Sequence, residues 1–247
     1  MEPAVLAGDY IFVNKLTLDA RVYKNFNFRN GGKVETKRLW GWRDIRRNDV
    51  LVFNFPYSDW GNLDFDFNVF YVKRCVAIPG DTFYIENGIY KVKNCPERLG
   101  NYACQLQFSK VNPENMAPGI WNCFPFDAGY DWNVRQFGPL YLPCKGDVLP
   151  IDTCNIKLYR NLIRYETDKE LSIQGDRVYL DDEMLQYYTF QKNYYFMAGD
   201  LVSNSGDSRY WGLLPEDHIV GKAAIIWKSK DIHSGKFRWE RVLKTIN

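Results

Sequence analysis

The sequence predicts a mainly β protein whose strands pair in antiparallel sheets. Aromatic residues make up 17% of the 247 residues, a share that favours strands and wide half-buried surfaces over a helical bundle. Tight turns repeatedly lead into short apolar runs, as at Gly8-Asp9 and Asn48-Asp49. Asn87-Gly88 separates two further runs and is the strongest short hairpin signal. A chain of this length buries a sizeable core, in one large domain or two smaller ones.

The strands are expected in chain order from these patterns. The first strand follows Gly8 and reaches Lys15, and the second, at residues 50–55, is stopped by Pro56. A long strand at residues 69–78 ends at a Pro-Gly-Asp turn, and residues 82–86 and 89–92 flank the Asn-Gly hairpin. Later strands are expected at residues 194–197, 223–227 and 237–242.

The middle of the chain differs in composition from its two ends. Residues 94–190 are enriched in Cys, Pro, Asn and Gly, which predicts a β-rich subdomain inserted between two parts of a core, residues 1–93 and 191–247. One helix is expected there at residues 153–165, because Leu158, Leu162 and Ile163 share a face and Asp152 or Thr153 can cap it. A second hairpin is expected at residues 176–185.

Charge and hydropathy exclude several classes of function. The net charge is +2, and the basic residues form no long run that would follow a phosphate backbone, so nucleic acid is not an expected partner. No stretch approaches the roughly 18 consecutive apolar residues that cross a bilayer.

The six cysteines have no metal-binding spacing, and the chain has 2 histidines, so neither zinc nor another metal is expected. Five of the six lie between Cys95 and Cys154, which favours disulfides in an oxidising compartment. Cys95 and Cys104 are the favoured pair, and the odd cysteine of the cluster is expected to be free or paired with Cys75.

Lys73 is the candidate catalytic residue. In a strand, Tyr71, Lys73, Cys75 and Ala77 share one face, on which the lysine is the only charge. Burial on that face penalises the ammonium and lowers the lysine pKa, as a general base near neutral pH requires. The alternative is an ordinary lysine whose head group reaches into water.

Three segments resemble the sequence boxes of bacterial type I signal peptidases, in the order in which that family has them. They read Met-Glu-Pro at residues 1–3 with Gly-Asp at 8–9, Tyr-Val-Lys-Arg-Cys-Val-Ala-Ile-Pro-Gly-Asp at 71–81, and Gly-Asp-Leu-Val-Ser-Asn-Ser-Gly-Asp-Ser-Arg-Tyr-Trp-Gly at 199–212. The resemblance implies an antiparallel β catalytic core with an inserted lobe, as in signal peptidases and repressor-type peptidases.

The resemblance also implies a Ser/Lys endopeptidase that removes signal peptides after small residues. Lys73 is then the general base, Ser205 orients it, and Asp207 with Arg209 braces the loop, unless that pair is only a surface salt bridge. The pocket for the small residue is expected from Met1, Val5, Tyr71 and Val72.

The expected partners are the signal peptides of exported preproteins, bound as an added strand beside Lys73, and the membrane surface. The body of a monomeric enzyme is expected to face the periplasm at the bacterial inner membrane, without metal or organic cofactor. Trp40 and Trp42 are candidates for contact with the bilayer interface, with core packing as the alternative.

The chain departs from the family pattern at two places. The nucleophilic serine stands directly before the methionine of the first box and is expected immediately before Met1, outside this chain; a start at a true initiator methionine is the alternative. The third box has Leu201-Val202-Ser203 where Asn-Arg-Asp is usual. A catalytically silent paralogue that binds exported peptides is therefore the rival interpretation. Two other classes of protein are not favoured. A self-cleaving repressor would need a DNA-binding domain and a Ser-His-Asp hydrolase would need a GxSxG motif, and the sequence shows neither.

Overall fold

The computed structural model describes residues 1–16, 18, 21–23, 36–38, 43–59, 62–64, 68–116 and 119–246. The described strands are β1 (Asp9–Asn14), β2 (Arg21–Tyr23), β3 (Thr36–Arg38), β4 (Val50–Asn54), β5 (Tyr57–Asp59), β6 (Asn62–Leu63), β7 (Phe70–Ala77), β8 (Thr82–Glu86), β9 (Ile89–Val92), β10 (Gln136–Tyr141), β11 (Val148–Pro150), β12 (Leu171–Gln174), β13 (Arg177–Leu180), β14 (Glu183–Met184), β15 (Tyr187–Thr189), β16 (Tyr194–Ala198), β17 (Leu214–Pro215) and β18 (Ile219–Ser229). The described helices are α1 (Tyr102–Ser109), α2 (Ile156–Thr167) and α3 (Ser208–Trp211), with 3-10 turns η1 (Pro113–Asn115), η2 (Glu216–His218) and η3 (Trp239–Arg241). The predicted mainly β class is confirmed.

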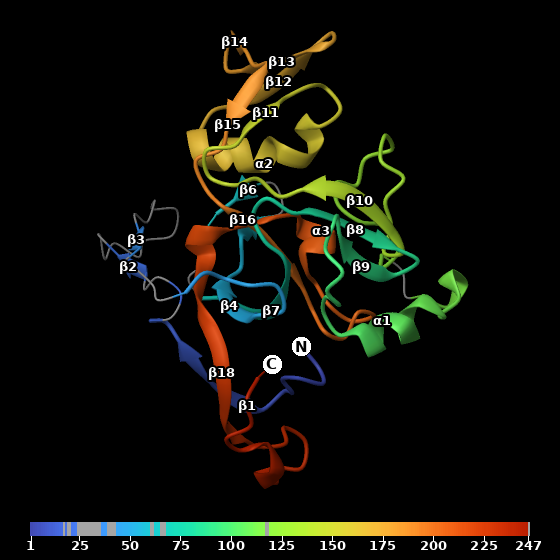
Figure 1. Cartoon of the computed structure of the whole chain (residues 1–247), viewed down its shortest axis with the longest axis vertical. Helices are drawn as coiled ribbons and strands as arrows, with labels where there is room; N and C mark the ends of the chain where they lie inside the picture. Colours follow the sequence, from blue (N-terminus) through green and yellow to red (C-terminus); the bar gives the residue numbers. More distant parts are fainter. Residues whose placement is uncertain are drawn as a thin grey trace.

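A six-stranded antiparallel sheet forms the centre of the molecule, in the order β1-β18-β4-β7-β16-β17. Its strands come from the first and last parts of the chain. β1 and β18 extend from one end of the molecule, while α2 and the β12-β13-β14 sheet lie at the opposite end (Figure 1). β8 and β9 form the predicted Asn-Gly hairpin, and β8 also pairs with β10 in a three-stranded sheet separate from the main one. The division of the chain at residues 93 and 190 stays a prediction.

Both faces of the main sheet are covered by apolar side chains. β4 shows this alternation: Leu51 and Phe53 join the large core on one face, and Val50 and Val52 join a smaller cluster on the other. All five β4 residues are therefore buried, and the central strands read as continuous apolar runs. This double burial fixes the position of β7, the strand that carries Lys73.

Local predictions hold for the hairpins and fail at some termini. The hairpin around Asp181 is confirmed by the pairing of β13 with β14. Helix α2 begins at Ile156 instead of residue 153, because the Asp152 carboxylate accepts hydrogen bonds from the backbone nitrogens of Cys154 and Asn155 in a turn before the helix. Neither Asp152 nor Thr153 is the N-cap, which is Asn155.

Two further elements differ from the sequence-based expectation. Helix α1 was not predicted, because only Gln105 and Phe108 of its side chains are buried and no apolar stripe marks it. The strand expected at residues 237–242 is wrong: Phe237 makes an isolated bridge to Lys230, and a 3-10 turn follows.

The predicted disulfides are also wrong. All six cysteines are free, including Cys95 and Cys104. Both of these pack against the large core, and burial raises the pKa of the Cys104 thiol, which makes it less reactive. Cys75 is fully buried inside β7, away from any cysteine partner.

None of the described helices is long and apolar enough to span a bilayer. Trp40 and Trp42, which were candidates for interfacial contact, lie outside the described residues.

Candidate active site

Lys73 projects from the middle of β7 toward the loop that follows β16. Its Nζ lies 2.9 Å from Oγ of Ser205 and 5.5 Å from the centre of the Tyr71 ring. Burial lowers the pKa of the Lys73 amine; the charge of Asp207 opposes this shift, and that of Arg209 adds to it. The head group is therefore held at a hydroxyl and an aromatic ring, and its neutral form is favoured relative to a lysine in water.

Gly199 makes room for the contact between Lys73 and Ser205. A Cβ placed on Gly199 would lie 2.1 Å from Oγ and 2.7 Å from Cβ of Ser205, and 3.5 Å from Nζ of Lys73. No residue with a side chain fits there unless Ser205 moves. The sequence marked Gly199 as part of a resembling box without assigning it this role.

Asp207 and Arg209 form a buried ion pair that braces the same loop. Both side chains are 0% exposed, so they do not form a surface salt bridge. Arg209 donates through Nε and a terminal nitrogen to the Asp207 carboxylate at 2.8 and 2.9 Å, and also to the Val202 carbonyl. Asp207 also accepts a hydrogen bond from the backbone nitrogen of Gly199. Burial opposes ionisation of Asp207, but the Arg209 charge and these hydrogen bonds hold its pKa below the ordinary value.

A second buried ion pair, Arg74 with Asp200, was missed by the sequence reasoning. Arg74 donates to both carboxylate oxygens of Asp200, at 2.7 and 2.8 Å, and to the carbonyl of Asn48. Both residues stand next to site residues, Arg74 after Lys73 and Asp200 after Gly199. Their places in two resembling boxes were the available signal. The pair joins β7 to the start of the Ser205 loop.

The four residues predicted to line the small-residue pocket divide between the two faces of the sheet. Met1, Val5 and Val72 pack against the smaller apolar cluster, while Tyr71 packs against the large core. The ring of Tyr71 lies 4.7 Å from that of Phe55. Met1, Val5 and Val72 therefore lie against one apolar cluster, and Tyr71 lies on the opposite face of the sheet.

The first residues of the chain pack beside β7, because Met1 and Val5 lie against the same apolar cluster as Val72. Arg241 donates to the carbonyl of Ala4, and Arg238 to that of Ala7, so the C-terminal part of the chain holds this segment against the sheet.

β7 has an open edge beside Lys73. On one side, residues 70–74 pair with β4. On the other side, β16 pairs only with Arg74, Cys75 and Ala77, and within the described ranges no strand pairs with residues 70–73 on that side. An extended peptide can add to such an edge through main-chain hydrogen bonds.

A metal site is not found at this place or elsewhere in the described part of the chain, where no cluster of three His, Cys, Asp or Glu side chains occurs. The described site consists of an amine, a hydroxyl, two buried ion pairs and an open strand edge. An amine with a lowered pKa beside a hydroxyl can take up and release a proton.

Comparison with known proteins identifies the family. The family model described as "Signal peptidase, peptidase S26" matches residues 1–116 and 143–228. Signal peptidase I of Buchnera aphidicola subsp. Schizaphis graminum is 26% identical over 241 residues, covering 93% of this chain and 65% of that protein. Signal peptidase I of Aquifex aeolicus is 27% identical over 245 residues, covering 95% and 74%, and that of Pseudomonas aeruginosa is 27% identical over 241 residues, covering 93% and 62%.

The chain thus spans about two thirds of the length of the first two relatives, at 65% and 66%. The match includes the segments that carry Lys73 and Ser205, and the fold is the antiparallel β architecture that the resemblance implied. Because the family model covers most of the chain, this protein belongs to the signal peptidase family, peptidase S26.

Proposed function

We propose that the protein is a serine endopeptidase that removes signal peptides from exported preproteins, with Lys73 as its general base. The observation that carries this proposal is the amine of Lys73, held 2.9 Å from Ser205 with a lowered pKa. A lysine acts as a base only when it is neutral, and burial favours that form.

The proposed nucleophile is the hydroxyl of a serine directly preceding Met1, as in the family box that the first residues resemble. Met1 and Val72, the residue before Lys73, both pack against the smaller apolar cluster, which supports this position. Lys73 would accept the hydroxyl proton as the serine oxygen attacks the scissile carbonyl carbon, and would return a proton to the leaving amine. Water would then hydrolyse the acyl-enzyme.

Ser205 is proposed to orient the amine, since its hydroxyl lies at hydrogen-bonding distance. Asp207 and Arg209 are proposed as positioning residues, because their buried pair ties Gly199 and Val202 to the end of the Ser205 loop.

The proposed substrate is an extended segment with small residues before the scissile bond. The open edge of β7 supports strand addition beside Lys73. Met1, Val5 and Val72 support a shallow apolar pocket on the opposite face of β7 from the Lys73 side chain, which favours Ala, Gly or Ser over bulky residues.

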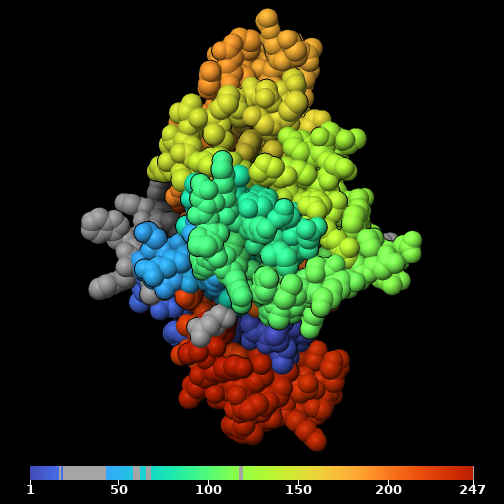
Figure 2. Space-filling view, turned by 45° about the vertical axis from the view of Figure 1, so that its right-hand side comes forward, coloured from blue at the N-terminus to red at the C-terminus, as the bar shows by residue number. Residues whose placement is uncertain are grey.

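The proposed location is the bacterial inner membrane, with the catalytic body on the periplasmic side, as a monomer. Support comes from an aromatic surface on β1, β18 and the residues after β18, whose members are Tyr10, Phe12, Trp227, Phe237 and Trp239, each at least 46% exposed. Lys228 lies over two of these rings. Exposed aromatic rings beside a lysine suit a membrane-water interface. The residues from β18 onward form one end of the molecule (Figure 2).

Vesicle binding tests the membrane contact. Trp227→Ala and Trp239→Ala are expected to weaken sedimentation with anionic vesicles, whereas Trp121→Ala, an equivalent change at a 36% exposed tryptophan elsewhere, is expected to leave it unchanged. Equal binding by all three variants would remove the aromatic surface from the proposal.

Cleavage of a preprotein with an Ala-x-Ala site tests the activity, with the chain extended upstream through the codons of its gene. Lys73→Ala is expected to abolish cleavage with an unchanged melting temperature. Lys91→Ala, which replaces an exposed strand lysine, is the matched control. Full cleavage by Lys73→Ala would refute the assigned base, while peptide binding without cleavage by the unaltered enzyme would favour the silent paralogue.

A further inference from the structure

The segment after β18 returns to the first residues of the chain. Residues 243–246 run beside β18, where the Ile246 nitrogen donates to the Ala224 carbonyl at 3.0 Å. Ile246 is 4% exposed and belongs to the apolar cluster against which Met1 and Val5 pack. The C-terminal segment therefore builds part of the surface on which these two residues lie.

Asp9 is the buried centre of the contact between the two segments. Its side chain is 0% exposed and accepts hydrogen bonds from the Leu6 nitrogen at 2.8 Å and the Ser229 hydroxyl at 2.6 Å. Arg241 donates to the same carboxylate through Nε at 3.2 Å and through Nη2 at 2.6 Å. Burial opposes ionisation of Asp9, but the hydrogen bonds from Arg241 and Ser229 hold its pKa below the ordinary value. The Arg241 guanidinium is thus fixed in place by a charged partner.

Arg241 is linked to Met1 through one peptide group. Its Nη2, which donates to Asp9, also donates to the carbonyl oxygen of Ala4 at 3.0 Å. The nitrogen of that same peptide group belongs to Val5 and donates to the Met1 carbonyl at 3.0 Å. The Ala4–Val5 peptide is therefore held on both sides, by the guanidinium and by the Met1 carbonyl. Hydrogen bonds arranged in such a chain polarise and strengthen one another.

The contact with Ala4 is the polar anchor of residues 1–5. Among the residues that the structure describes, no other hydrogen bond joins residues 1–5 to a different segment. Gly8 has an anchor of its own, since the Lys230 nitrogen donates to its carbonyl at 2.9 Å. Loss of Arg241 would therefore free the turn at residues 1–5 and leave Gly8 attached.

We propose that Arg241 is a positioning residue of the peptidase, which fixes Met1, and with it the serine proposed directly before Met1, relative to Lys73. This role rests on the proposed function, since that function places the nucleophile there. Arg241 contacts Asp9 and the Ala4 carbonyl, so it acts through the Ala4–Val5 peptide and not on the reacting atoms. It lies after residue 228, where the match to the family model ends.

The position of Met1 can be followed without any cleavage, in protein labelled with ¹³C at the methionine methyl groups. The chain has 4 methionines, and the Met1 resonance is assigned by its absence in Met1→Leu. Arg241→Gln is expected to move that resonance toward the position of an exposed methionine. The resonance of Met197, which is 0% exposed in the core, is expected to stay in place and reports that the variant is folded.

Preprotein cleavage by the chain extended upstream measures the consequence for catalysis. At a temperature where all variants are folded, Arg241→Gln is expected to lower kcat about tenfold or more, because the nucleophile is no longer held in place relative to Lys73. If Arg241→Gln does not fold, the double variant Asp9→Asn/Arg241→Gln replaces it with the same expectation, because it leaves no buried carboxylate without its arginine.

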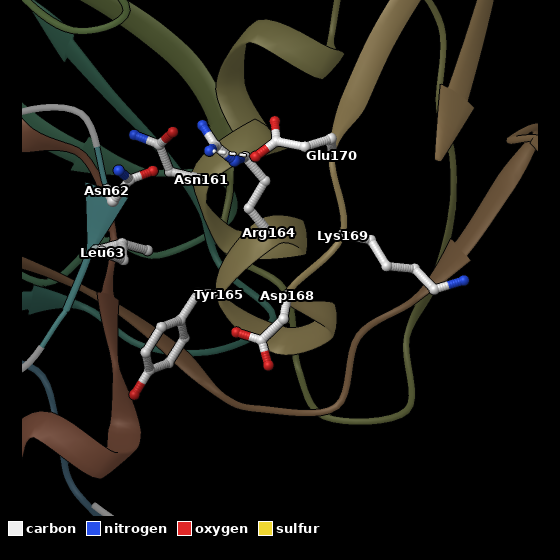
Figure 3. Close-up of a pocket in the computed structure, with 8 residues that line it drawn as sticks. All are labelled: Asn62, Leu63, Asn161, Arg164, Tyr165, Asp168, Lys169 and Glu170. Carbon is white, nitrogen blue, oxygen red and sulfur yellow. Dashed lines mark hydrogen bonds and ion pairs between the residues drawn. The ribbon is translucent and has the colours of Figure 1, made fainter. Parts of the chain in front are cut away.

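Two other arginines provide controls in which the same charge is lost. Arg47→Gln removes a pair with Asp81, to which the arginine Nε donates at 2.8 Å. Arg164→Gln removes a pair with Glu170 at 2.7 Å (Figure 3), on α2 at the opposite end of the molecule from β1 and β18 (Figure 1). Both variants are expected to keep the Met1 resonance and kcat close to those of the parent, even where the melting temperature falls.

The results that would overturn the proposal are specific. They are an unmoved Met1 resonance in Arg241→Gln, an equal displacement in all the arginine variants, or a displaced Met1 with an unchanged kcat. Absence of cleavage by the unaltered extended chain would instead refute the proposed function, and the Met1 resonance would still decide whether Arg241 fixes the first residues.

Discussion

Adding one methyl group at Gly199 is expected to break the contact between Lys73 and Ser205. In Gly199→Ala the new Cβ would lie 2.1 Å from Oγ and 2.7 Å from Cβ of Ser205. Rotating the hydroxyl away relieves only the first clash, so the Ser205 backbone has to move as well. The 2.9 Å hydrogen bond to Lys73 is then lost.

The expected magnitude follows from these distances. An ordinary contact to the new Cβ requires Ser205 to retreat by roughly 1 Å, which takes its hydroxyl out of hydrogen-bonding range of Nζ. A misplacement of about 1 Å at a catalytic group costs on the order of 10²-fold in rate. Overpacking of the buried loop costs about 1–3 kcal/mol of unfolding free energy.

Preprotein cleavage and urea unfolding measure the two effects, and Gly206→Ala is the matched control. Gly206 lies in the same loop, but a Cβ there meets no atom within 4 Å, so its rate and stability are expected to stay close to those of the parent enzyme. A Gly199→Ala enzyme as active as Gly206→Ala would show that the Ser205 contact does not orient the base.

Three other predictions concern charge and thiols. At pH values between the lowered pKa of Lys73 in the folded protein and its ordinary value, the unfolded chain binds more protons than the folded one. The free energy of unfolding should therefore rise with pH in this window, and the rise should be smaller in Lys73→Met. An unchanged pH profile in that variant would contradict the lowered pKa. Asp207→Asn leaves Arg209 buried without its carboxylate partner and should lower the free energy of unfolding by about 3–5 kcal/mol. The same change removes a negative charge that raises the Lys73 pKa, so the rising limb of the pH-rate profile should move to lower pH. Denaturant melts and a pH-rate profile measure both effects, and a limb shifted to higher pH would refute the electrostatic assignment. The free cysteines predict that a thiol reagent labels the exposed Cys154 first and the buried Cys75 and Cys123 only on unfolding; fewer than six thiols in the unfolded, unreduced chain would revive the disulfide prediction.

The sequence by itself determined most strands of the central sheet and singled out Lys73 as the candidate base. The apolar runs of β4 and β7 and the turn residues at Asn87-Gly88 are local signals, because a short apolar run bounded by turns is typical of a strand buried on both faces and an Asn-Gly pair suits a two-residue hairpin. The resemblance of three short segments singled out Lys73 and Ser205, although 132 positions separate them.

Only the tertiary structure decided how those residues meet. The pairing of Arg74 with Asp200, the space that Gly199 leaves for Ser205 and the full burial of Asp207 and Arg209 depend on packing between distant segments, which no local pattern encodes. For the same reason, the cysteine spacing gave the wrong pairing: whether two thiols meet depends on where their elements pack, and Cys75 lies inside the core while Cys154 is exposed.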